Sequence, residues 1–149
     1  MGNELKLMPG YKEEQLVNNR AAVVVWGGGE AERRDWAAEA AWLLDPEVAV
    51  QEVSEPTLLI KALGSGRGVV YVPDASQLPG EVQRELVRAL KEKEERPKVV
   101  LGLSSSPDQV LAKGQWRDDL HFAFSRGRVD LGNADVKAAR AKRRKKSKR

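Results

Sequence analysis

The chain has 149 residues, 41% of them hydrophobic, which suits one ordinary domain with its own core. It has no cysteine, which excludes disulfides and thiolate chemistry. Its one histidine, His121, leaves too few ligands for the usual zinc sites and makes a histidine-dependent triad a poor expectation. The net charge is +4. No apolar run approaches the roughly 20 residues that cross a bilayer, so we expect a cytoplasmic protein without a membrane segment. We also expect no metal and no cofactor.

Alternating strands and helices are predicted along the chain. Residues 1–20 form a polar lead-in with a short helix near 11–19. The continuous apolar run at 21–26 is typical of a strand buried on both faces, and 30–45 is rich in strong helix formers. Further strands are predicted within 48–53, 68–75, 95–106 and 124–132, and further helices within 54–63, 78–95 and 107–114.

This order of elements predicts the fold class. Strands that alternate with helices form parallel sheets through right-handed crossovers. We therefore expect an α/β domain at residues 21–133, a three-layer sandwich with a mostly parallel sheet. The helix at 78–95 is strongly amphipathic, with its apolar face formed by Val82, Leu86, Val87 and Leu90.

The C-terminal end of the chain is strongly basic. It carries nine of the 26 basic residues and no acid after Val136, whereas the rest of the chain is about 5 units negative. Self-repulsion predicts a disordered tail at 134–149 that binds nucleic acid non-specifically by counterion release; an extension that only improves solubility is the alternative. The cations are Lys137, Arg140, Lys142, Arg143, Arg144, Lys145, Lys146, Lys148 and Arg149.

Between Gly68 and Phe124 the chain resembles the AAA+ ATPase domain of sigma-54-dependent transcription activators. In that family a strand with a Walker B acidic pair is followed by an ELP turn, a long helix, a strand with a polar sensor and a segment of the form FREDLYYRL. The corresponding pieces here are GVVYVPDASQLP, EVQRELVRALKEKEERP, KVVLGLSSSPDQVLAKG and QWRDDLHFAF, which agree over roughly 55 positions. The resemblance implies an AAA+/P-loop-like core.

The stretch GGGEAERR, residues 27–34, stands where the family has its phosphate-binding loop. In GxxxxGK[ST] the glycines let N–H groups surround the phosphates, the lysine reaches the outer phosphates and the hydroxyl holds magnesium. Here Arg33 stands at the position of the lysine and Arg34 at the position of the hydroxyl residue. The negative charges of Glu30 and Glu32 disfavour binding of an anion. The glycines fit a tight strand-to-helix turn. Residual nucleotide binding is the alternative, through Gly27, Gly28, Gly29, Arg33 and Asp74.

Other family features are also changed. Pro73 replaces the aspartate of the Walker B pair, and Asp74, one methylene shorter than the catalytic glutamate, is expected to cap a turn rather than to bind magnesium. Arg117 matches the first trans-acting arginine, which makes it a candidate for contacting a neighbouring subunit, but the adjacent Asp118 and Asp119 favour a local ion pair at a helix start. The segment before Gly68 is too short for the GAFTGA loop, and no lid domain is expected after Leu131.

These departures predict a protein that is not an enzyme. We expect a catalytically inactive AAA+-like binding or regulatory module, with the α/β body contacting a protein partner or itself and the tail contacting DNA or RNA. One alternative is a weak nucleotide hydrolase in which Arg33 replaces the lysine and Asp74 replaces both acids. Another is a partner-binding subunit similar to the clamp-loader delta type.

Overall fold

Five short strands form one sheet in the computed structural model, which describes residues 11–92 and 95–146. The strands are β1 (Val23–Trp26), β2 (Gln51–Glu52), β3 (Val69–Val72), β4 (Lys98–Gly102) and β5 (Arg128–Asp130). Their order is β2-β3-β4-β1-β5, and all four pairings are parallel. The parallel α/β sheet that the sequence predicts is therefore confirmed, although β2 is only two residues long.

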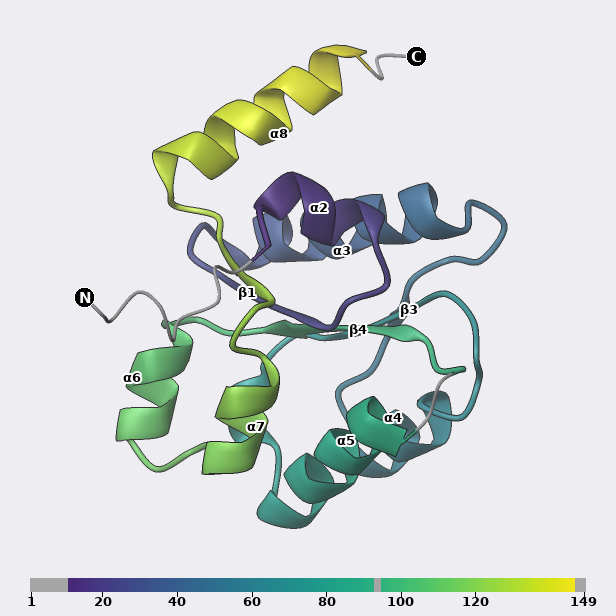
Figure 1. Cartoon of the computed structure of the whole chain (residues 1–149), viewed down its shortest axis with the longest axis vertical. Coiled ribbons are helices and arrows are strands. Elements are labelled where there is room, and N and C mark those ends of the chain that lie inside the picture. Colours follow the sequence, from purple (N-terminus) through teal and green to yellow (C-terminus); the bar gives the residue numbers. More distant parts are fainter. Residues whose placement is uncertain (1–10, 93–94, 147–149) are drawn as a thin grey trace, which may run out of the picture.

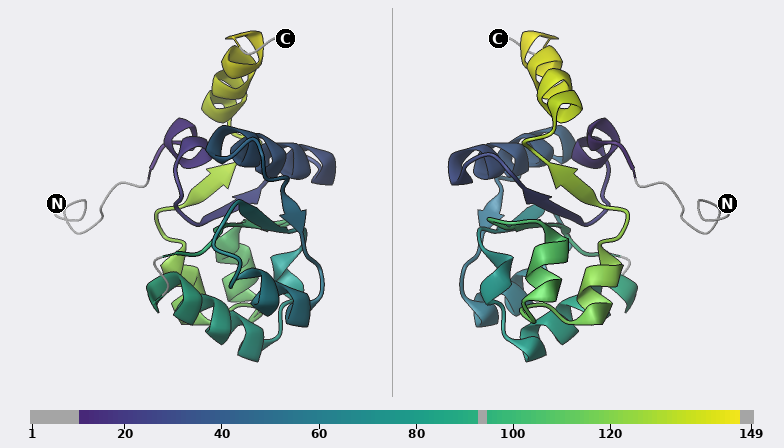
Figure 2. Two further views of the ribbon diagram at one scale, coloured as in Figure 1. Left: turned by 90° about the vertical axis from the view of Figure 1, so that its right-hand side faces the viewer. Right: turned by 90° about the vertical axis from the view of Figure 1, so that its left-hand side faces the viewer.

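Helices cover both faces of this sheet, which gives three layers (Figure 1). Helices α2 and α3 lie on one face, with α8 beyond them, and α4 to α7 lie on the other (Figure 2). None of the helices in the described part of the chain has the length and apolar composition needed to cross a membrane. The helices are α2 (Glu13–Asn18), α3 (Glu30–Leu44), α4 (Pro56–Ala62), α5 (Gly80–Glu92), α6 (Pro107–Ala112), α7 (Asp118–Ala123) and α8 (Ala134–Lys146), with a short 3-10 turn, η1, at Ala75–Gln77.

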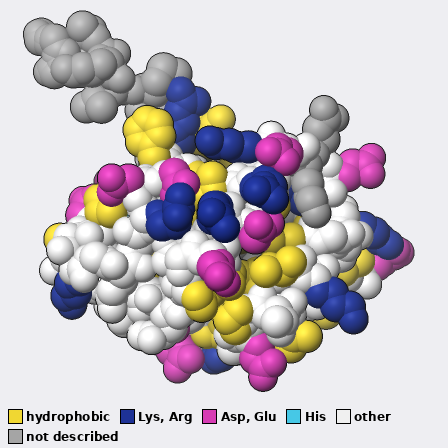
Figure 3. Space-filling view, turned by 90° about the horizontal axis from the view of Figure 1, so that it is seen from below, with side chains coloured by type: hydrophobic (Ala, Val, Ile, Leu, Met, Phe, Trp, Pro, Cys, Tyr) yellow, Lys and Arg dark blue, Asp and Glu magenta, His cyan; other side chains and the backbone are white. Residues whose placement is uncertain are grey.

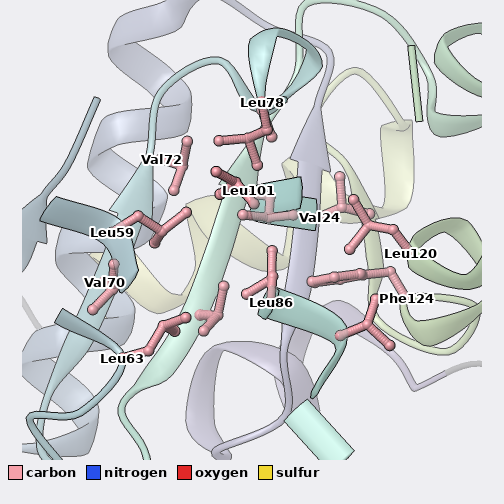
Figure 4. Packing of buried hydrophobic residues seen from close by; sticks show 14 of the residues in the cluster. Val24, Leu59, Leu63, Val70, Val72, Leu78, Leu86, Leu101, Leu120 and Phe124 are labelled. Atoms are coloured by element: carbon pink, nitrogen blue, oxygen red, sulfur yellow. The ribbon is translucent and has the colours of Figure 1, made fainter. Parts of the chain in front are cut away.

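The core between the sheet and α4 to α7 is built from alternate strand residues and the apolar faces of the helices. Val24 and Leu101 point to this side from the two central strands, and Leu86 of α5 packs against them (Figure 4). The apolar face predicted for α5 is buried here, with Leu90 only partly covered. Leu120 and Phe124 extend the core toward α7 and its end.

The core on the opposite face includes residues that the sequence assigns to a lead-in. Leu16 and Val17 of α2 are fully buried together with Trp36 of α3, Val23 and Val25. The polar residues around Leu16 and Val17 hide this pair, because a helix of six residues shows too little periodicity to reveal a buried face. Helix α2 therefore belongs to the body of the domain.

The prediction of a disordered tail is wrong for residues 134–146, which form α8. Its charges do not simply repel one another, because two of its arginines pair with acids of α2 and α3. Asn133 also accepts hydrogen bonds from the N–H groups of Asp135 and Val136 at the start of the helix. The predicted cations Lys148 and Arg149 lie outside the described residues.

Candidate functional site

The glycine-rich loop joins β1 to α3 at the edge of the sheet where the parallel strands end. Gly27 and Gly28 have φ angles of +76° and +57°, which disfavour any residue with a side chain. A Cβ atom at Gly27 would also collide with the Asp130 carboxylate and approach the Gly132 nitrogen to 2.8 Å. Gly27 and Gly28 are thus required by a tight turn, and Gly27 packs against the end of β5, whereas Gly29 has a negative φ and free space for a Cβ atom.

Side chains from α3 form hydrogen bonds with the backbone of the glycine-rich loop. Arg33 is 8% exposed, and its Nη1 donates to the carbonyl oxygens of Gly27 and Gly28, at 3.4 and 3.2 Å. The Gly29 N–H donates to the Glu32 carboxylate, at 3.3 Å. The loop therefore offers carbonyls to an internal cation and an N–H to an internal carboxylate. An anion would have to displace Glu32 and compete for Arg33.

Asp74 follows β3 and caps a turn. Its Oδ1 accepts from the N–H and the hydroxyl of Ser76, at 3.1 and 2.6 Å, at the start of η1. This is the capping geometry that the sequence favours over a magnesium site. The described residues contain no group of three or more His, Asp or Glu side chains that could hold a metal ion.

Arg117 makes a local ion pair, the role that its sequence neighbours favour over a subunit contact. Its Nε and Nη2 donate to the two carboxylate oxygens of Asp119, at 3.0 and 3.1 Å. This hydrogen bonding raises the pKa of Arg117 and lowers the pKa of Asp119. The Arg117 N–H donates to Gln83, a buried α5 residue that the sequence analysis did not single out.

A cavity of about 510 Å³ opens beside the glycine loop, between α2, α8 and the ends of β1 and β5. Trp26 lines it, and the residues of the degenerate phosphate loop and Asp74 do not. Four carboxylates and two cations line the wall, so the local charge is unfavourable for a triphosphate. The charged lining residues are Lys12, Glu13, Glu14, Arg128, Asp130 and Asp135.

Helix α8 is fastened across α2 and α3 by Arg143. Its guanidinium makes paired hydrogen bonds to both Glu13 (2.7 and 2.6 Å) and Glu39 (2.8 and 2.9 Å). These bonds, led by those to Glu39, raise the pKa of Arg143. Glu13, whose side chain is only 4% exposed, also accepts from the Trp36 indole N–H at 2.6 Å. We call Arg143, Glu13, Glu39 and Trp36 the α8 anchor.

A second contact links α8 to the glycine loop. Arg140, which is 6% exposed, lies 3.4 Å from the carboxylate of Glu32, the same residue that accepts from the Gly29 N–H. Two of the nine predicted nucleic-acid cations are therefore used inside the domain. In the described part of the tail, the cations with exposed side chains are Lys137, Lys142, Arg144 and Lys145, and Lys146 ends the helix.

Sequence reasoning did not identify Glu13, Glu39 or Trp36 as partners of the basic segment. The one available signal was the net negative charge of the body, which balances the basic end of the chain. The net charge does not show which acids pair with the basic segment, because the partners are far apart in the sequence: Glu13 and Arg143 are separated by 130 residues.

No family model and no curated protein matches this sequence. The structure is similar to the P-loop NTPase domain of the sigma-54 transport activator from E. coli, with 16% identity, 79% of this chain and 87% of that chain covered, and a TM-score of 0.63. It is similar to NtrX from Brucella abortus in complex with ATP, with 15% identity, 85% of this chain covered and a TM-score of 0.62; the chain spans 38% of NtrX.

A protein of another kind has a similar fold. The chain is similar to a DNA polymerase III gamma subunit-related protein from Thermotoga maritima, with 14% identity, 88% of this chain and 48% of that chain covered, and a TM-score of 0.58. Identities this low establish the fold alone. The residues that the structure describes therefore have the fold of an AAA+-like P-loop NTPase domain, as the sequence resemblance predicts.

Proposed function

We propose that the chain is a catalytically inactive AAA+-like binding module whose α/β body binds a protein and whose helix α8 contacts nucleic-acid backbones. The proposed lack of catalytic activity is supported by the glycine loop, whose backbone groups form hydrogen bonds with side chains of α3. Arg33 is directed to the carbonyls of Gly27 and Gly28, and Glu32 accepts the Gly29 N–H. A phosphate-binding loop needs its N–H groups free and converging on the anion.

The proposal is tested by nucleotide binding and turnover. We expect ATP or GTP with magnesium to leave the melting temperature unchanged, and phosphate release to equal that of buffer. The reason is that Asp74 caps η1 and Glu32 repels the phosphates. Magnesium-dependent turnover that disappears in Asp74→Ala would overturn the proposal. Nucleotide binding that disappears in Arg33→Ala would favour the weak hydrolase instead. Arg84→Ala, which removes an exposed arginine of α5 away from the loop, serves as the control for both measurements.

Nucleic-acid contact is supported by the way α8 divides its charges. Arg140 and Arg143 turn toward the body, while Lys142, Arg144 and Lys145 remain exposed. Figure 1 shows α8 standing on the outer side of α2 and α3, where an extended polyanion can reach it. A row of exposed cations on a helix neutralises phosphates without reading bases.

A charge variant tests this contact more sharply than a truncation, because truncation also removes the anchor. We expect the triple variant Lys142→Gln, Arg144→Gln and Lys145→Gln to bind duplex DNA more weakly, with the salt slope reduced by about 2 to 3. Fluorescence anisotropy across a series of salt concentrations measures both quantities. The matched control is Lys61→Gln, Arg84→Gln and Lys113→Gln, which removes three exposed cations from other elements. Equal slopes for the two variants would contradict the assignment to α8.

Protein binding through the body is supported by its exposed apolar side chains. Leu58 and Ile60 of α4 and Phe122 of α7 are exposed, Phe122 by 76%. Seen from below, hydrophobic side chains lie between charged ones (Figure 3). A partner that binds this body without nucleotide fits the proposal, and a role similar to that of a clamp-loader subunit is a more specific version of it.

A further inference from the structure

Three cations gather at the edge of the sheet opposite the glycine loop, where β1 and β4 begin. Arg20 lies just before β1, Arg96 just before β4, and Lys98 is the first residue of β4. The Arg20 Nη2 donates to the Arg96 carbonyl. The Lys98 ammonium donates to the carbonyls of Asn19 and Ala21, at 2.8 and 2.5 Å. The three residues are therefore neighbours, and we call them the amino-edge cluster.

The three side chains of the amino-edge cluster differ in burial, from the protein surface to the interior. Arg20 is exposed, Arg96 is partly buried and Lys98 is fully buried. Two of the three N–H donors of Lys98 are used by carbonyls, which leaves one for another acceptor. Burial, together with the positive charges of Arg96 and Arg20, lowers the pKa of Lys98 to about 7. Burial and the charge of Arg20 also lower the pKa of Arg96.

This cluster differs from several ion-paired arginines of the domain in having no acid partner among the described residues. Arg34 pairs with Glu52, for example, and Arg67 pairs with Asp45. Among the described residues, no carboxylate forms a hydrogen bond or ion pair with a member of the amino-edge cluster. Carbonyl oxygens thus hold the cations together, and no described acid forms an ion pair that would offset their repulsion.

We infer that the amino-edge cluster is a binding site for a phosphate group, which would sit between the guanidinium groups of Arg20 and Arg96. Two guanidinium forks suit a tetrahedral dianion, which accepts several charge-assisted hydrogen bonds at once. The charge of Lys98 behind them adds attraction from a site that water screens poorly. The bound group would supply the negative charge that the described residues do not pair with these cations.

This site is separate from the two regions described above. It lies at the amino ends of the strands, whereas the glycine loop lies at their carboxyl ends. None of its members belongs to α8, so the proposed nucleic-acid contact can fail while this site stands.

Inorganic phosphate is the first probe, titrated into the full chain and compared with chloride at equal ionic strength. We expect phosphate to raise the melting temperature more than chloride does. In Arg20→Gln, which changes an exposed side chain and should fold normally, and in Arg96→Gln, the affinity should fall by about tenfold or more. Arg117→Gln, which removes an arginine from α7's start, should respond as the wild type does. Identical curves in phosphate and chloride, or a full response in both cluster variants, would overturn the inference.

A second readout follows Lys98 itself by NMR of its side-chain carbon next to nitrogen. Phosphate should raise the pKa of Lys98, since a nearby dianion favours the charged amine. An unchanged Lys98 titration at saturating phosphate would count against the inference.

A competition experiment distinguishes a free phosphate group from the phosphate of a nucleic-acid backbone. A short oligonucleotide is added to the α8 triple variant. Competition with inorganic phosphate there assigns the site to a phosphodiester backbone, and binding of phosphate without competition assigns it to a free phosphate group.

Discussion

Replacing Arg143 by alanine is expected to lower the free energy of unfolding by about 3 kcal/mol and to release α8 from the body. Arg143 holds two carboxylates with four hydrogen bonds, and one of them, Glu13, is almost completely buried. Without the guanidinium, Glu13 would remain against α3 as an unpaired charge. Urea denaturation measures the loss of stability, and limited proteolysis after Leu131 measures the release.

Arg144→Ala is the matched control, because it removes an exposed arginine from the next position of the same helix. Its effect should stay within about 0.5 kcal/mol. The double variant Arg143→Ala, Glu13→Gln should recover part of the stability, since it removes the unpaired carboxylate as well. Similar losses for Arg143→Ala and Arg144→Ala would show that the α8 anchor does not hold the helix.

Stability should rise steeply with pH between about 7 and 9.5, by roughly 1.4 kcal/mol per pH unit, because of Lys98. The pKa of its ammonium is lowered from 10.5 to about 7 in the folded protein. Above pH 7 the folded state loses this proton while the unfolded state keeps it, so the unfolded state binds more protons. The neutral amine still donates to the carbonyls of Asn19 and Ala21. Chemical denaturation across this pH range measures the slope.

The control for this slope is Lys98→Met, which removes the titrating group and preserves most of the side-chain volume. The stability of the wild type minus that of Lys98→Met should increase with pH, while the same difference for the exposed Lys61→Met should be flat. Measurements should stop near pH 9.5, because burial raises the pKa of Tyr71, and a raised tyrosine pKa lowers stability at higher pH. Parallel curves for wild type and Lys98→Met would contradict the assignment.

The sequence predicts most of the fold because its strands and helices are locally distinct. The run Val23–Trp26 is apolar on both sides, as a central parallel strand requires, and the four-residue spacing of Val82 and Leu86 marks a helix. Edge strand β2 falls within the strand predicted at 48–53 but is only two residues long, and both of these residues are exposed, so its extent is hard to predict. The resemblance in the segment from Gly68 to Phe124 then supplies the architecture.

The candidate site is less predictable because its main contacts join distant segments. The sequence shows that Glu32 and Arg33 are wrong for a phosphate loop, but not that both side chains fold back onto the loop. It also shows a dense positive charge after Val136, and from charge alone a disordered tail follows. The acids that order this segment as a helix lie on α2 and α3, and only the fold brings them near.

The sheet order sets the sequence in which the chain can complete its folding during synthesis. The central strand β1 leaves the ribosome early, but Val23 pairs with Val100 and Val24 pairs with Arg128. Both edges of β1 therefore remain unpaired until β4 and β5 have been synthesised. Strands β2, β3 and β4 follow one another in the chain and in the sheet, so they can assemble first. Until β1 joins them, the unpaired VVVW segment of the nascent chain is open to aggregation or to chaperone binding.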